Sequence, residues 1–239
     1  VTYTTAMVAA KHHSKRDDVP SEGGESSSEE DAAQQVDEDD LPPRTFCEYR
    51  RGRELGRGGS ARVFVCRRKD CAIGFAVKAV DLRRVQLSPN SELEKKTLYR
   101  ELEILKALPS HPHIVQMVDA FENAHWFLLV LELVGGGDLF TCLTSRSPAR
   151  LLEPEVLHVL RQLASGLDFL HGQKIIHRDL KLENTLVAAE RREKTIVLYT
   201  VKITDFGLSK VVCNDGSAAM SLVGTQQYVA PEVSLGNTY

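Results

Sequence analysis

Three short segments in the second half of the chain combine residue types that suit chemistry on phosphate groups. HRDLKLEN places Asp179, Lys181 and Asn184 within six residues, close enough for their side chains to converge on one reaction centre. Further along are DFG at 205–207 and GTQQYVAPE at 224–232. An ammonium group such as that of Lys181 can neutralise phosphate charge. The three segments therefore indicate a polar reaction centre.

Two features of the first half fit the same chemistry. LGRGGSARV, at 55–63, is a glycine-rich turn in which Gly56 and Gly58 allow the backbone to approach phosphate oxygens closely. Lys78 ends the apolar run FAVK, so its ammonium must find anions. The carboxylate of Glu101 or that of Glu103 could pair with it. We favour Glu101, because the apolar residues that follow it indicate which helix face points inward.

The hydrophobic pattern predicts the elements that would position these residues. Short apolar alternations in 49–80 indicate strands, and the pattern at 91–108 indicates a helix. HWFLLVLEL reads as a buried strand that leads into glycines 135–137. A second helix is expected from Glu153 to His171, with Leu157, Leu160, Ala164, Leu167 and Leu170 on one apolar face. Strands come first and helices second, which predicts a two-lobed α+β domain with a cleft at the joint.

Composition divides the chain of 239 residues near residue 44. Residues 17–40 contain eleven acidic residues and no Lys or Arg, whereas 41–239 contain 27 basic and 22 acidic residues. We expect 1–44 to be a disordered acidic tail and 45–239 to be the folded domain. The chain shows no signal peptide and no membrane-spanning run, and its five cysteines form no CxxC pair, so we expect reduced thiols in the cytoplasm or nucleus.

Taken together, the five motifs resemble those of the eukaryotic protein kinase family, in family order from about residue 49 to the end of the chain. The family fold has a β-rich N-lobe, here about 45–134, and a helical C-lobe, here about 135–239. Kinase domains normally continue past the APE motif. We therefore expect the domain to be partial, the parent protein to be longer, and this fragment alone to fold poorly or lack activity.

The resemblance implies a role for each motif residue in ATP-dependent phosphoryl transfer. Asp179 would accept the proton of the substrate hydroxyl, and Lys181 would lie beside the γ-phosphate. Lys78, held by Glu101, would orient the α- and β-phosphates, while Asn184 and Asp205 would bind Mg²⁺. Val63, Ala76 and Leu186 would sandwich adenine, and backbone groups of Glu132 and Val134 would meet its edge. Leu55, Gly56 and Gly58 of the glycine-rich turn would also bind the nucleotide, with the glycines next to its phosphates.

The same resemblance extends to substrate class. Lys181 and Thr225 match serine/threonine kinases, with features of the calmodulin-dependent and checkpoint group. Asp138 and Glu183 match carboxylates that bind substrate arginines, which predicts basic residues upstream of the acceptor.

Regulation and partners can also be predicted. Arg178 would meet a phosphate on Ser221 or Ser217, placed there by an upstream activating kinase. Protein substrates are the other expected partners; nucleic acid and membrane are not expected, and the sequence indicates no oligomeric state.

Some residues depart from the family pattern, and two other functions remain open. Ser60, Ala61 and Leu182 replace commoner residues without removing a catalytic group, and 187–199 is longer than usual, which predicts a solvent-exposed hairpin. An ATP-binding scaffold without transferase activity would be expected to lack Lys78, Asp179 or Asp205, all of which are present. A small-molecule phosphotransferase usually lacks the GT...APE segment.

Overall fold

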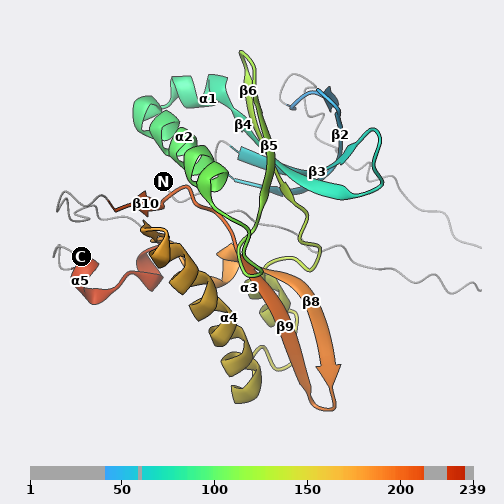
Figure 1. Ribbon diagram of the computed structural model, residues 1–239, viewed down its shortest axis with the longest axis vertical. Helices are drawn as coiled ribbons and strands as arrows, with labels where there is room; N and C mark the ends of the chain where they lie inside the picture. Colours follow the sequence, from blue (N-terminus) through green and yellow to red (C-terminus); the bar gives the residue numbers. More distant parts are fainter. Residues whose placement is uncertain (1–40, 59–60, 213–224, 235–239) are drawn as a thin grey trace, which may run out of the picture.

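The computed structural model describes residues 41–58, 61–212 and 225–234, and its N-terminal lobe is built on one antiparallel sheet (Figure 1). The strands lie in the order β1-β2-β3-β4-β6-β5. Their bounds are β1 Thr45–Phe46, β2 Tyr49–Arg57, β3 Ala61–Arg68, β4 Gly74–Asp81, β5 Met117–Glu122 and β6 Trp126–Glu132. β4 and β6 are central and buried on both faces, which is why their sequences read as continuous apolar runs.

Two helices follow β4. A short one, α1 (Leu82–Leu87), was not expected, and α2 (Ser91–Ala107) matches the expected helix closely. α2 ends before Leu108, which precedes a proline and is extended, as such residues favour. The helix buries Leu98, Glu101, Ile104 and Leu105. Glu101 thus lies on the inner face, as predicted, and Glu103 is exposed.

The C-terminal lobe begins after the joint at 133–138. Its elements are α3 (Leu139–Thr144), α4 (Glu153–Gly172), β7 (Ile175–Ile176), the 3-10 turn Leu182–Asn184, β8 (Thr185–Glu193), β9 (Ile196–Ile203), β10 (Lys210–Val211), the 3-10 turn Gln226–Tyr228 and α5 (Pro231–Ser234). β8 pairs with β9, and β7 with β10. The two-lobed α+β fold is confirmed.

The apolar face predicted for α4 is wrong in its first half. Leu170 is buried and Leu167 packs against the core, as predicted. Leu157, Leu160 and Ala164 are exposed, and the helix also buries Glu155, Val159, Gln162 and Gly166. The register is set by β9, which packs on α4 and takes up the polar side chains of Glu155 and Gln162. A pattern based only on apolar residues cannot predict a buried helix face that contacts its neighbour partly through hydrogen bonds.

The hairpin expected at 187–199 is present as β8 and β9, but it is not wholly solvent-exposed. Val187 and Tyr199 are buried beside Leu139 and Val159, whereas the outer half of β8 is exposed. The base of the hairpin is therefore part of the C-lobe core.

Two composition-based expectations concern the tail and the thiols. Most of the predicted tail, residues 1–40, lies outside the described residues. Leu41 packs against the cluster that holds Phe46 and Tyr49, so contact with the N-lobe begins a few residues before the expected boundary. Cys47, Cys66, Cys71 and Cys142 are free thiols, as expected, and Cys213 lies outside the described residues. Among the described helices, none is long and apolar enough to cross a membrane.

Candidate active site

Lys78 lies where the two lobes meet and is held between two carboxylates. Its Nζ lies 2.7 Å and 2.8 Å from the two oxygens of Glu101 and 3.4 Å from Oδ1 of Asp205. β4 supplies the lysine, α2 the glutamate and the segment after β9 the aspartate. The ion pair between Lys78 and Glu101 therefore fixes α2 against the sheet. Burial opposes the lysine charge, but the two carboxylates outweigh it and raise the pKa of Lys78. Ala61, Lys78, Glu101 and Gly207 line a common cavity, which leaves space beside the ammonium group.

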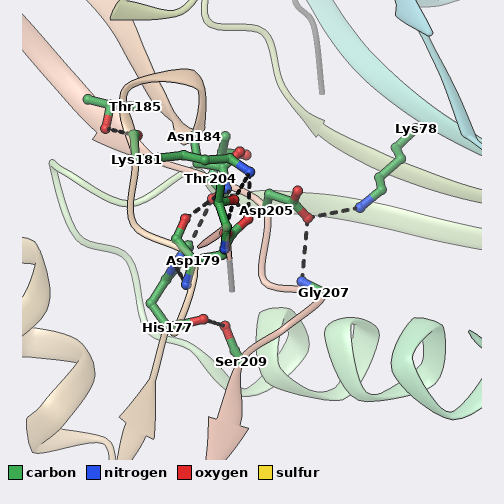
Figure 2. A network of polar contacts seen from close by, with 11 residues as sticks. Lys78, His177, Asp179, Lys181, Asn184, Thr185, Thr204, Asp205, Gly207 and Ser209 are labelled. Carbon is green, nitrogen blue, oxygen red and sulfur yellow. Dashed lines mark hydrogen bonds and ion pairs between the residues drawn. The ribbon is translucent and has the colours of Figure 1, made fainter. Parts of the chain in front are cut away.

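Asp179 is surrounded by donors in the loop between β7 and β8 (Figure 2). The Lys181 ammonium lies 2.8 Å from one carboxylate oxygen, which also accepts a 3.0 Å hydrogen bond from the amide of Asn184. The other oxygen accepts hydrogen bonds from the Thr225 hydroxyl and backbone N–H, at 2.6 Å and 3.0 Å. Lys181 also donates to the Thr225 hydroxyl at 2.7 Å. These contacts fix the position and orientation of the Asp179 side chain.

Asn184 and Asp205 flank the base of the β8–β9 hairpin and suit the magnesium role expected of them. The Asn184 amide nitrogen donates to Asp179, while its Oδ1 is buried and has no hydrogen-bond partner among the described residues. An orphaned buried oxygen beside a carboxylate fits a hard cation. Among the described residues, no group of three or more His, Cys, Asp or Glu side chains is arranged to hold a metal ion, so Asn184 and Asp205 would supply only part of a coordination shell. Retained water and phosphate oxygens would supply the rest.

The residues expected around adenine belong to one apolar cluster. Leu55, Val63 and Ala76 come from the sheet, Val134 from the joint and Leu186 from β8, and all are buried in this cluster. Gly56 pairs with Val63, and the N–H of Gly58 donates to Ala61 O at 2.8 Å, which closes the glycine-rich turn.

The joint between the lobes is held by its own polar contacts. The Glu132 carboxylate accepts a 2.8 Å hydrogen bond from the Gln116 N–H, and lies 2.7 Å from the ammonium of Lys202 on β9. Glu132 thereby fixes the strand that leads into the joint. The exact fit of these residues to a nucleotide stays a prediction.

The residues expected to bind substrate or a regulatory phosphate lie in different environments. Asp138 is buried as the N-cap of α3, where its carboxylate accepts hydrogen bonds from the Thr141 N–H and hydroxyl. Glu183, the other carboxylate expected to bind a substrate arginine, has its Oε2 buried without a hydrogen-bond partner in the described part of the chain. Arg178 donates to Leu208 O at 2.7 Å, and Ser217 and Ser221 lie outside the described residues.

Two supporting residues escaped the sequence analysis. The His177 ring is buried against Phe206, and its Nε2–H donates to Thr204 O at 3.0 Å, which ties the loop of Asp179 to the segment of Asp205. Burial lowers the pKa of His177, so the ring stays neutral. Gln162 hydrogen-bonds the β9 backbone from α4. No sequence signal singled out Gln162, because α4 carries several other polar residues.

Comparison with known proteins agrees with this geometry. The family model described as "Protein kinase domain" matches residues 49–239. The chain is 37% identical to the yeast (Saccharomyces cerevisiae) cell cycle serine/threonine-protein kinase CDC5/MSD2, over 79% of this chain and 24% of that protein. It is 35% identical to mouse (Mus musculus) death-associated protein kinase 2, over 76% of this chain and 47% of that protein. A probable myosin light chain kinase of Dictyostelium discoideum is also 35% identical, over 77% of this chain and 44% of that protein.

The chain thus spans less than half the length of these three relatives. The comparisons nevertheless confirm the resemblance drawn from the motifs, to eukaryotic serine/threonine kinases similar to the calmodulin-dependent group. The chain belongs to the protein kinase family.

Proposed function

We propose that this chain is the catalytic part of a serine/threonine protein kinase that transfers the γ-phosphate of Mg·ATP to protein hydroxyls. The observation that carries the proposal is the arrangement around Asp179, which the Lys181 ammonium, Asn184 and Thr225 hold as a buried, oriented carboxylate. An oriented base beside a fixed cation is what phosphoryl transfer needs, because the reaction depends mainly on positioning and charge neutralisation.

Each polar residue has a defined part in this reaction. Asp179 accepts a hydrogen bond, and then the proton, from the attacking hydroxyl. Lys181 neutralises charge that develops on the transferring group, while Lys78, fixed by Glu101, orients the remaining phosphates. Asn184 and Asp205 would hold magnesium, which draws charge from the phosphate oxygens when it is bound. The apolar cluster that contains Leu186 would exclude water from the adenine ring.

We also propose a preference for arginine upstream of the acceptor and control through the activation segment. Glu183 supports the first point, because a guanidinium would satisfy its unpartnered oxygen. Phosphorylation of Ser221 or Ser217 by an upstream kinase would give Arg178 a phosphate partner and order the segment. Protein substrates, an upstream kinase and an intracellular location complete the proposal.

The test is transfer of labelled γ-phosphate from Mg·ATP to a serine peptide with arginine three residues upstream, catalysed by the full-length protein. Asp179→Asn keeps the side-chain shape but removes the proton acceptor, so we expect transfer to fall by about 10²–10⁴-fold. A peptide with glutamate in place of arginine should react more slowly. Nucleotide binding without transfer by the wild type, even after phosphorylation of Ser221, would support the scaffold alternative instead.

A further inference from the structure

The tip of the β8–β9 hairpin presents an exposed hydroxyl outside the active site. Lys194 and Thr195 form the turn that joins the strands, and the turn places Lys194 at a φ of 52°. Thr195 is exposed, and its hydroxyl makes no hydrogen bond within the described parts of the chain. Figure 1 shows the hairpin extending alongside α4, with its tip away from the N-lobe. The hydroxyl is therefore accessible to another protein.

The residues before Thr195 are basic in a specific register. Arg192 lies three residues upstream, Arg191 four residues upstream and Lys194 directly before it. Arg191 pairs with Glu193 and Arg192 pairs with Glu190. The arginine side chains are nevertheless 72% and 77% exposed, respectively. Ion pairs this exposed contribute little, so a better carboxylate partner can replace them. The segment matches the upstream arginine that the proposed function requires of a substrate.

Few backbone bonds hold the tip of the hairpin closed. Val197 pairs with Arg192, yet its N–H donates to the Glu155 carboxylate on α4, away from the opposite strand. Since backbone bonding alternates along antiparallel strands, Glu193 and Ile196 form the last bonded pair. Opening that pair alone releases 192–196, which includes the residues from three before Thr195 to one after it. Glu155 holds the rest of β9 in place.

The hairpin cannot deliver Thr195 to the active site of its own molecule. Its base lies next to Asn184 and its tip is reached eight residues later, along a paired strand. At about 3.3 Å per residue the tip lies roughly 26 Å from the base. The strands are clamped to α4 at Glu155 and Gln162, so they cannot fold back. Transfer to Thr195 must take place between two molecules.

We propose that Thr195 is a phosphorylation site, modified in trans by a second copy of this chain. The proposal rests on the proposed function. In the reaction, the bond between the γ-phosphorus and the β,γ-bridging oxygen breaks, and a bond forms between that phosphorus and Thr195 Oγ1. ADP leaves with the bond electrons, and Asp179 of the enzyme copy takes the hydroxyl proton. Arg192 of the substrate copy would meet Glu183 of the enzyme copy.

The test uses full-length Asp179→Asn protein as the substrate and a catalytic amount of wild-type protein as the enzyme. After incubation with Mg·ATP, mass spectrometry identifies the modified residue. We expect phosphate on Thr195, a rate proportional to the concentration of each partner, and at least a tenfold lower rate for a substrate carrying Arg192→Ala. Thr195→Val should abolish this signal, and Thr200→Val, at an exposed position on β9, should leave it unchanged.

The serine peptide assay, run in parallel, separates the two proposals. Wild-type protein that phosphorylates the peptide but leaves Thr195 unmodified would overturn the inference and preserve the proposed function. Modification that is indifferent to Arg192→Ala would also overturn it, because recognition would then not depend on the upstream arginine. Absence of transfer to both the peptide and Thr195 would overturn both proposals.

Discussion

Gln162 on α4 joins the helix to β9 through a buried side-chain amide. Its Nε2 donates to Tyr199 O at 2.8 Å and to His158 O at 3.0 Å, and its Oε1 accepts from the Val201 N–H at 3.0 Å. Gln162 is 8% exposed and Val201 is fully buried. Because β9 ends two residues before Asp205, the amide helps to place the strand that carries a proposed magnesium ligand.

We predict that Gln162→Glu lowers the free energy of unfolding by about 3–4 kcal/mol near pH 8. The substitution preserves size and the acceptor for Val201, so it creates no cavity. It replaces the donor with an anionic oxygen facing two carbonyl oxygens. Two lost hydrogen bonds cost about 1 kcal/mol each, and an unsatisfied Tyr199 carbonyl adds about 1–2 kcal/mol. Total stabilities are of the order of 5–15 kcal/mol, so the change is measurable.

Urea unfolding of the two proteins at pH 8 and pH 5 measures the effect. Burial and the carbonyl oxygens would raise the carboxyl pKa in the folded variant, so the folded state binds a proton that the unfolded state has lost. Stability of the variant relative to wild type should then recover as the pH falls, since a protonated carboxyl can donate to Tyr199. Arg161→Gln, at an exposed neighbouring position, should change stability by less than about 0.5 kcal/mol. A loss below 0.5 kcal/mol for Gln162→Glu, or a loss independent of pH, would refute this reasoning.

Two further predictions concern other buried charges. Lys78→Met should lower kcat by about 10²–10³-fold in the peptide assay, since it removes the cation between Glu101 and Asp205. Lys106→Met, on the exposed surface of α2, should leave kcat unchanged. Equal activity of Lys78→Met and the wild type would contradict the role of Lys78. Burial opposes ionisation of Glu155, but hydrogen bonds from Arg146, Leu152 N–H and Val197 N–H outweigh burial and lower the pKa of Glu155. The ionised side chain therefore stabilises the fold fully above about pH 4.5, and this stabilisation is lost as the pH falls through the folded-state pKa. Unfolding at pH 7 and below pH 4.5 should therefore show a smaller acid loss for Glu155→Gln than for wild type, and parallel losses would contradict this.

The sequence by itself determined the order of the main elements and the polar residues proposed for the active site. Strands around Lys78 and helices at 91–107 and 153–172 follow from local periodicity, because that signal depends only on neighbours along the chain. The motif residues followed from their side-chain chemistry and spacing. The pairing of Lys78 with Glu101 could be predicted as well, because the helix period placed that carboxylate inward.

Only the tertiary structure decided which face of α4 is buried, what Asp138 does and how the hairpin is anchored. The leucines of α4 predicted one face, yet β9 selected the face of Glu155 and Gln162, whose hydrogen bonds join residues about forty positions apart. Asp138 caps α3 because the chain turns there after the joint. Such contacts depend on the packing of distant segments, and a local pattern carries no information about which backbone group will lie opposite a polar side chain.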